Sequence, residues 1–375
     1  MNFLVANDSG NAEQDMFLNG CLVKSPNVFA RVQKLNNMDE VNPQYVLEHI
    51  HDNLIVAIDG RLYYVGNYAL KSGQHCRSIT VGVDNDKVSS EIVFINTLAH
   101  IAGEAVARTA QENQGKLDAD CGINVEVDMA TAIPVSYYTK AKAEEFARKF
   151  THKRHVVTVY VGAMDYSVFL NFSFVKVIPE GVTAAHALLD APDLLKQPAE
   201  SSSAPRILHI AIGEGTTEFP ITTGVAFKPD FITGTNNGNG HAIARVLEDF
   251  KREYGLSAIT RQDFSRYVMD EGHKYHQAAL DMLLPALDDE AEDILVMAQQ
   301  VMERANNEID VVAVYGGGSI LMRPALEKRL QAFCDRAKVQ LLYITDAETA
   351  VLMEARGLDV FIHSPLFNAL KEREA

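Results

Sequence analysis

The sequence predicts an α/β protein with two domains that flank a ligand-binding cleft. Its 375 residues exceed a typical single core, and 47% of them are hydrophobic, which is ample for packed layers. Short apolar runs alternate with segments in which apolar residues recur at helical spacing. Two of the short runs end in small, polar turns, residues 7–11 and 213–217, and such turns allow a ligand to approach the backbone closely.

The N-terminal segment predicts a β-hairpin. Residues 3–6 form a short apolar strand, which runs into the turn Asp8-Ser9-Gly10-Asn11 and is followed by a second strand near residues 16–18. Asp8 stands where the strand ends, so its carboxylate would face a ligand held by the turn. The other interpretation is that Asp8 closes the turn through its own side chain.

Residues 206–224 predict a second hairpin. An apolar run over 207–212 enters the tight turn 213–217, and a second extended run leaves over 218–222. Gly213 and Gly215 allow the backbone N–H groups to face an anion, and Thr216 and Thr217 add hydroxyl donors. An ordinary glycine hairpin is the alternative interpretation.

The third element is a buried strand over 311–315, which opens through Gly316, Gly317 and Gly318 toward a helix expected over 324–333. A strand that passes through glycines into a helix is a common seat for a nucleotide, although any α/β crossover can contain it.

The remaining segments predict an α/β alternation. Strands are expected over 54–58, 61–65, 122–133, 155–175 and 340–344, and helices over 89–112, 141–150, 242–254, 260–267, 275–300 and 346–357. A strand also runs into Pro179-Glu180 ahead of an alanine-rich helix over 182–189.

In its order of motifs, the chain resembles the actin-like ATPase superfamily, which also holds the heat-shock chaperones and the sugar kinases. The turn near residue 8, the turn near 213 and the strand with three glycines near 316 match its phosphate-1, phosphate-2 and adenosine motifs. Within the superfamily the chain is most similar to the plasmid-segregation actins of the ParM and Alp type. The segment 63–69 and the ending 350–358 also resemble theirs, the latter only in part.

The resemblance implies two ribonuclease-H-like domains around a nucleotide cleft. Residues 1–180 would form the first domain, with a small inserted subdomain at about 20–90 and a C-terminal return over 345–375. Residues 181–344 would form the second. The bound ligand would be ATP or GTP with Mg²⁺, and Asp8 would hold the metal through water. Glu180 would orient the attacking water, although it could also be a first-turn helix residue that the helix dipole favours.

One departure from the family pattern concerns Ala211. The phosphate-2 motif usually begins with an aspartate that holds a magnesium-bound water, and a methyl group cannot do this. Ala211 is either native to a slow hydrolase or an engineered Asp→Ala change. We favour the second because Asp8, Glu180 and the glycines are retained, and we expect intact nucleotide binding with poor turnover. Glu214 also replaces a more usual glycine near the phosphates.

The charge and the composition limit the kinds of partner that the chain is expected to bind directly. The net charge of −16 argues against direct binding to DNA or to an anionic membrane. No apolar stretch approaches the length of a membrane span, the start lacks a signal peptide, and the four cysteines form no CxxC motif, so we expect a cytoplasmic protein with reduced thiols. The resemblance implies self-assembly into filaments that nucleotide hydrolysis disassembles, and a DNA-binding adaptor that links the filament to a plasmid.

Two other functions of the same superfamily stay open. A sugar or small-acid kinase would need a catalytic aspartate other than Asp8 near the γ-phosphate, and no such motif is evident. A heat-shock-type nucleotide-binding domain would be followed by a β-rich peptide-binding domain, which is lacking here.

Overall fold

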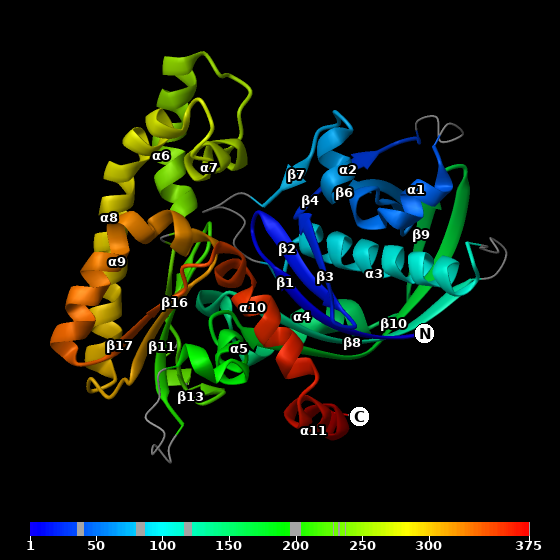
Figure 1. Cartoon of the computed structure of the whole chain (residues 1–375). Helices are drawn as coiled ribbons and strands as arrows, with labels where there is room; N and C mark the ends of the chain where they lie inside the picture. The colour runs from blue at the N-terminus through cyan, green and yellow to red at the C-terminus, as the bar shows by residue number, and fades with distance from the viewer. Residues whose placement is uncertain are drawn as a thin grey trace.

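The computed structural model describes residues 1–35, 41–79, 87–115, 122–195, 204–227, 229–231, 233–236 and 238–374. Two β-sheets lie side by side in it, each covered by helices, and a pair of helices lies between them (Figure 1). The predicted α/β class is confirmed. The arrangement follows from the alternation of strands and amphipathic helices, because each sheet must bury both of its faces.

Among the described residues, the first sheet has ten strands in the order β3-β2-β1-β8-β10-β9-β5-β6-β4-β7. They are β1 (Asn2–Ser9), β2 (Glu13–Leu18), β3 (Cys21–Pro26), β4 (Val28–Val32), β5 (Ile55–Ile58), β6 (Arg61–Val65), β7 (Arg77–Ser78), β8 (Ile123–Ile133), β9 (His155–Val161) and β10 (Met164–Pro179). Strands β1, β8 and β10 are parallel, so their carboxyl ends reach the same edge of the sheet.

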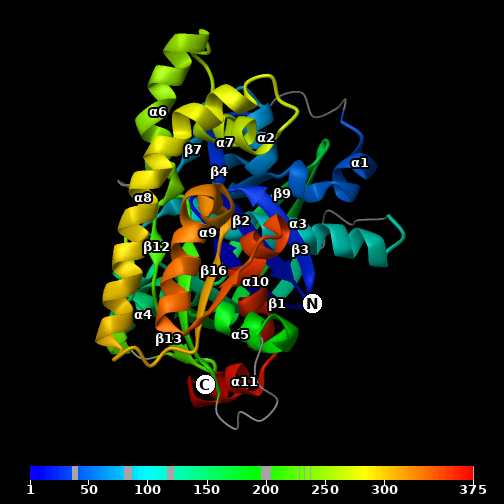
Figure 2. The same cartoon turned by 60° about the vertical axis from the view of Figure 1, so that its left-hand side comes forward.

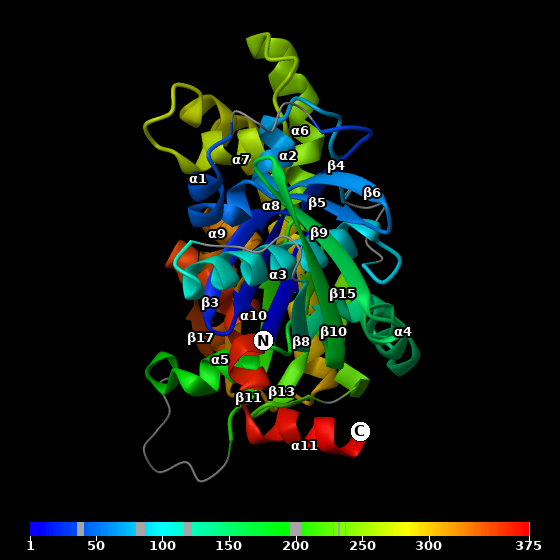
Figure 3. The ribbon, with the colours of Figure 1, turned by 90° about the vertical axis from the view of Figure 1, so that its right-hand side faces the viewer.

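The two faces of this sheet bury alternate residues of its strands. Val127 and Met129 belong to the core under α3 (Glu91–Glu112) and α4 (Lys140–Thr151). The rings of Phe94 in α3 and Phe150 in α4 are 5.3 Å apart, so both helices cover the same face, and Figure 3 shows α3 lying across it. Of the two small helices, α2 (Gly66–Lys71) packs near β4 and β6, and α1 (Pro43–Glu48) near α3 and β9.

The second sheet consists of β11 (Arg206–Ile212), β12 (Thr217–Glu218), β13 (Ile221–Thr223), β14 (Ala226–Phe227), β15 (Gly234–Thr235), β16 (Val311–Tyr315) and β17 (Gln340–Tyr343). One face packs against α6 (Asn239–Tyr254), α7 (Arg261–Met269), α8 (His276–Arg304) and α9 (Gly317–Ala337). Figure 2 shows the long α8 along the outer side. Strands β11 and β16 are parallel, so they too end at one edge.

Helices α5 (Ala184–Asp190) and α10 (Ala347–Ile362) form the layer between the sheets. Met353 of α10 packs in the core of the second sheet with Tyr315, whereas Leu358 packs in the core of the first with Phe174. The C-terminal segment therefore returns to the first sheet, where α11 (Pro365–Glu374) follows it. A side chain at Gly357 would lie 2.0 Å from the carbonyl oxygen of Thr183, so glycine allows α10 to cross the start of α5.

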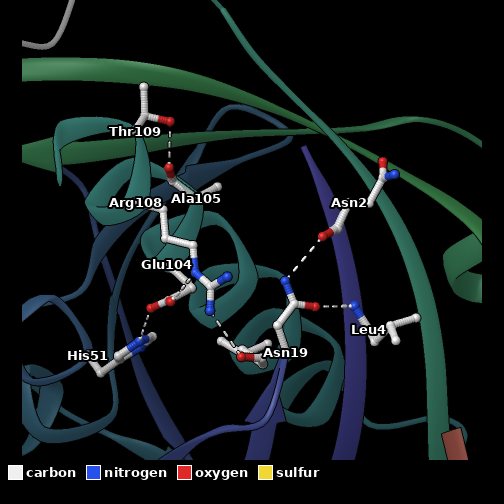
Figure 4. A network of polar contacts seen from close by, with 9 residues as sticks. Asn2, Leu4, Asn19, His51, Glu104, Ala105, Arg108 and Thr109 are labelled. Carbon is white, nitrogen blue, oxygen red and sulfur yellow. Dashed lines mark hydrogen bonds and ion pairs between the residues drawn. The ribbon is translucent and has the colours of Figure 1, made fainter. Parts of the chain in front are cut away.

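Polar contacts fasten the far end of the β1–β2 hairpin (Figure 4). Asn19 accepts a hydrogen bond from the backbone N–H of Leu4 at 2.6 Å, and Arg108 of α3 donates to the carbonyl oxygen of Leu18 at 3.1 Å. Glu104 pairs with Arg108 at 2.6 Å and with His51 at 3.0 Å. The hairpin is thus held to α3, which sets the position of its turn at the other end.

The structure moves two of the expected helix boundaries. Helix α9 begins at Gly317 and contains Pro324, where the sequence pattern predicted its start, and α6 begins at Asn239. Cys21, Cys76 and Cys334 are free thiols, and Cys121 lies outside the described residues. Within the described part of the chain, no helix combines the length and the apolar character needed to cross a membrane.

Candidate nucleotide-binding site

A cavity of about 380 Å³ lies where the carboxyl edges of the two sheets face each other. The first sheet contributes residues at the ends of β1 and β10, and the second contributes the β11–β12 turn and the start of α9. Of the residues predicted from the sequence, the cavity is lined by Asp8, Gly10, Asn11, Glu180, Ala211, Gly213, Gly215, Thr216, Gly316, Gly317 and Gly318.

The side chains of Ser9 and Thr217, also predicted to bind the cofactor, do not line this cavity. Each follows a residue that does and is almost fully buried. Side chains alternate between the two faces of a strand, so the neighbours of Asp8 and Thr216 point away from the ligand side.

The turn after β1 is built from buried side-chain amides. Asn7 donates to the Thr97 hydroxyl at 3.0 Å and accepts from the Gln14 amide at 2.7 Å, while Asn27 donates to the carbonyl oxygen of Gly10 at 2.8 Å. A Cβ at Gly10 would lie 2.8 Å from the carbonyl oxygen of Glu13, so the turn requires glycine. These contacts hold Asp8 at the wall of the cavity.

The turn after β11 is fastened to the start of α6 through its carbonyl oxygens. Those of Gly213 and Glu214 accept from the N–H groups of Asn239 at 3.3 Å and Gly240 at 2.8 Å, and that of Gly215 faces His241 Nε2 at 3.1 Å. The C=O and N–H of a trans peptide point in opposite directions. The N–H groups of the same peptides therefore point away from α6, which suits an anion on the other side of the turn.

Close backbone approach explains two of the three glycines after β16, Gly316 and Gly318. Gly316 has φ 95°, and a Cβ there would lie 2.4 Å from the carbonyl oxygen of Ile212. A Cβ at Gly318 would lie 2.7 Å from the carbonyl oxygen of Gly213. The start of α9 thus abuts the turn after β11, and together they form one wall of the cavity.

Five ionisable residues of the cavity were not predicted from the sequence: Glu13, Asp15, Lys87, Glu218 and Glu354. Lys87 forms a buried ion pair with Glu180. Glu354 accepts a hydrogen bond from the N–H of Gly181 at 2.9 Å. No local pattern marks them, because they come from β2, β12, α10 and the segment before α3. The nearest signal was the ending 350–358, which matches the family pattern only in part.

The cavity is rich in carboxyl groups that are short of compensating charge. Burial, opposed by Lys87, raises the pKa of Asp8 to about 6. Burial together with the nearby Glu180 raises the pKa of Glu218 to about 8, and burial with Asp8 and Glu180 raises that of Glu354 well above its usual range. Burial lowers the pKa of Lys87, but Glu180 and Asp8 outweigh it and raise the value, so the ammonium group stays charged.

The structure accounts for Glu214, whose charge near the phosphates was unexplained. Its Oε1 lies 3.6 Å from Nε of Arg261 in α7, and burial raises the pKa of its carboxyl group. Both effects reduce the negative charge that Glu214 presents to the cavity. Its side chain also packs against Gly240, where a Cβ would lie 2.8 Å from Glu214 Cγ.

The carboxyl groups of the cavity suit a Mg²⁺ ion that binds together with a ligand. Asp8, Glu180, Glu218 and Glu354 offer the carboxylate oxygens that this ion prefers. Over the described residues, no group of three or more acidic, histidine or cysteine side chains is arranged to hold a metal by itself. Magnesium usually retains several waters and is bound by one or two carboxylates together with substrate phosphates, which fits this cavity.

A larger hollow of about 630 Å³ lies on the surface over His51, Glu104 and Arg108. It contains none of the residues predicted to bind the nucleotide, and Glu104 in it is already paired with His51 and Arg108 (Figure 4). The cavity between the sheets is therefore the candidate site.

Comparisons with known proteins agree with this architecture. The family described as "Actin like proteins N terminal domain" matches residues 8–182. The crystal structure of the actin-like protein Alp7A is similar over 100% of this chain and 99% of its own, with TM-score 0.70 and 16% identity. The archaeal actin homolog Ta0583 in complex with ADP covers 96% and 99%, with TM-score 0.65 and 17% identity. Bacillus thuringiensis ParM with ATP covers 98% and 99%, with TM-score 0.58 and 17% identity.

The fold is therefore that of actin over the whole chain, with two lobes of mixed α/β structure. Within this fold, residues 8–182 match the family of N-terminal domains of actin-like proteins. A search among curated proteins yields no match.

Proposed function

We propose that this chain is a nucleotide-dependent actin-like protein that polymerises into filaments, and that the filaments segregate plasmid DNA. The observation that carries the proposal is the convergence of two glycine turns, far apart in the sequence, on one cavity between the two sheets. Each sheet contributes one turn, so a ligand that contacts both would favour a closed arrangement of the two lobes.

The ligand proposed for this cavity is ATP or GTP with Mg²⁺. The turn after β1 and the turn after β11 would hold the phosphates, and Gly316–Gly318 would lie against the sugar and base. Solved structures of similar fold include Ta0583 in complex with ADP and Bacillus thuringiensis ParM with ATP. The magnesium ion would be held through water by Asp8 and would offset the charge that develops on the phosphates.

Hydrolysis would depend on residues that lie on both sides of the phosphates. Glu180 would orient the attacking water or accept its proton, and Lys87, paired with it, could contact a phosphate oxygen through its ammonium group. Ala211 offers no carboxylate, so we propose that turnover is slower than an aspartate at this position would allow.

Closed subunits would associate head to tail, and such contacts do not close on themselves, so they produce filaments. Hydrolysis would weaken the contact and disassemble the polymer. The acidic chain would reach DNA through a basic adaptor protein and would bind neither nucleic acid nor membrane directly, which is consistent with its net charge of −16 and a cytoplasmic location.

Pelleting and light scattering with ATP, GTP, ADP and no nucleotide test this proposal. We expect polymer with a nucleoside triphosphate, and loss of polymer when Asp8→Ala removes the carboxylate at the phosphate-1 turn. A protein that stays monomeric with every nucleotide, yet releases ADP only when a sugar or small acid is added, would instead be a kinase of the same superfamily.

A further inference from the structure

Ala211 and Glu218 lie directly opposite each other on neighbouring strands. Ala211 in β11 is the register partner of Glu218 in the antiparallel strand β12, and both residues line the cavity. Side chains at such opposed positions point to the same face of the sheet, with Cβ atoms about 4.5–5.5 Å apart. The side chain of Glu218 therefore leaves the backbone on the same face of the sheet as the side chain of residue 211, directly beside it.

The surroundings of Glu218 are shaped around its carboxyl group. Its side chain is 2% exposed. Gly234 in β15, the next strand, leaves the necessary space, because a Cβ there would lie 2.0 Å from Glu218 Oε2. The sheet thus holds this carboxyl group in a defined place, which an ordinary surface glutamate would lack.

This carboxyl group is short of partners within the described protein. The Thr216 hydroxyl, Lys87 and the backbone of Val135 lie near enough to lower its pKa, yet neither carboxyl oxygen makes a hydrogen bond of ordinary geometry. The nearby acid Glu180 is itself paired with Lys87. A buried carboxyl group with such weak partners is unfavourable unless a donor or a cation from outside the chain completes it.

The geometry points to Glu218 as the residue that replaces the missing acid of Ala211: its carboxylate holds a water of the metal ion that accompanies the nucleotide. This inference rests on the proposed nucleotide-binding function. It makes Glu218 the residue on which the metal dependence of nucleotide binding relies. Glu218 acts here as a positioning residue, through bound water. It also makes an alanine at 211 compatible with hydrolysis.

The test compares the chain with Glu218→Gln, with Ala211→Asp and with the double variant. Affinity for a fluorescent ATP analogue is measured in Mg²⁺ and in EDTA, alongside phosphate release. We expect Glu218→Gln to keep its affinity in EDTA, to lose the gain that Mg²⁺ gives, and to release phosphate about 10- to 100-fold more slowly. Adding Ala211→Asp to this variant should restore both properties.

Two further variants keep the result interpretable. Glu290→Gln is the matched control, because Glu290 is also 2% exposed. Glu290 lies in α8, pairs with Arg245 at 2.8 Å and does not line the cavity. Its loss should therefore leave the gain in affinity from Mg²⁺ unchanged. If Glu218→Gln does not fold, Glu218→Asp keeps the charge, shortens the side chain, and should reduce the Mg²⁺ gain without abolishing it.

The outcomes separate the two proposals. If the unmodified chain binds no nucleotide, the proposed function is wrong and this inference falls with it. If the chain binds nucleotide with a gain from Mg²⁺, and Glu218→Gln retains that gain, the inference is wrong while the proposed function stands.

Discussion

The hydroxyl of Tyr315, at the end of β16, donates a hydrogen bond of 2.8 Å to the carbonyl oxygen of Gly181, which follows β10. It joins the second sheet to the first directly behind the cavity, and both groups are buried. The same hydroxyl lies 3.2 Å from Nδ1 of His209, whose other ring nitrogen contacts the Thr222 hydroxyl at 2.9 Å. A polar chain therefore connects the two lobes at the base of the candidate site.

We expect Tyr315→Phe to destabilise the protein and to loosen nucleotide binding. The change leaves the buried carbonyl oxygen of Gly181 without this donor, which typically lowers the free energy of unfolding by about 1–3 kcal/mol. Nucleotide dissociation should become faster, because the lobes lose a shared contact. Tyr343→Phe is the control: it removes a hydrogen bond of 2.6 Å to Ser319 within one lobe, and should lower stability without changing dissociation.

Lys87→Met should weaken triphosphate binding and slow phosphate release. The variant keeps most of the apolar stem but leaves Glu180 without the cation that pairs with it. Breaking a buried ion pair by removing one partner destabilises a protein by about 3–5 kcal/mol. Binding of ATP and of ADP by calorimetry, with the melting temperature, would show the effect. Lys371→Met breaks the more exposed pair with Asp128 and should change neither affinity. Equal phosphate release by Lys87→Met and the parent chain would remove Lys87 from the mechanism.

Removal of divalent cations should reduce nucleotide affinity more than tenfold, on the order of 1.4 kcal/mol or more in binding free energy. The cavity presents the carboxyl groups of Asp8, Glu180, Glu218 and Glu354 to the ligand, while Lys87 provides positive charge among the described lining residues. A bare triphosphate would be repelled by ionised carboxylates. Titration in EDTA and in Mg²⁺ at constant ionic strength measures the difference, and equal affinities would contradict the proposed orientation of the phosphates.

The ligand-free protein should lose stability as the pH rises from 6.5 to 8. Burial, with Asp8 nearby, raises the pKa of Asp15 from 3.8 to about 8. In this window the folded state retains a proton that the unfolded state has released, so the free energy of unfolding falls with pH, by at most about 1.4 kcal/mol per unit for this group. Burial lowers the pKa of His209 to about 3, so this group acts below pH 6.5, whereas Glu218, with a pKa raised to about 8, adds to the fall in the same window.

Denaturation midpoints at pH 6.5, 7.25 and 8 would measure this slope. Asp15→Asn should make the slope shallower, since an amide does not titrate and only Glu218 is left to contribute, whereas Asp165→Asn on the exposed β10 hairpin should leave it unchanged. A slope that is the same in all three proteins would show that Asp15 is ionised throughout.

The hairpins and strands that surround the site could be predicted, because they depend on residues that are neighbours in the sequence. The hairpin around Asp8 and the hairpin around Gly215 follow from apolar alternation interrupted by turn residues. The strand over 311–315 and its glycines were also recognisable, although the helix begins at Gly317 and not at 324. The apolar pattern of α9 starts late because its first turn packs backbone against the turn after β11, where side chains have no room.

The sequence alone thus determined which segments turn, which are extended and in what order the three glycine motifs occur, since backbone preferences are local. Only the tertiary structure decided that Lys87 meets Glu180, that Glu218 faces Ala211, and that Glu354 reaches across from α10. Ionisation in the cavity depends on loss of water and on charges brought from distant parts of the chain. No short sequence pattern encodes this burial or these charges, because they arise only when both sheets enclose the same cavity.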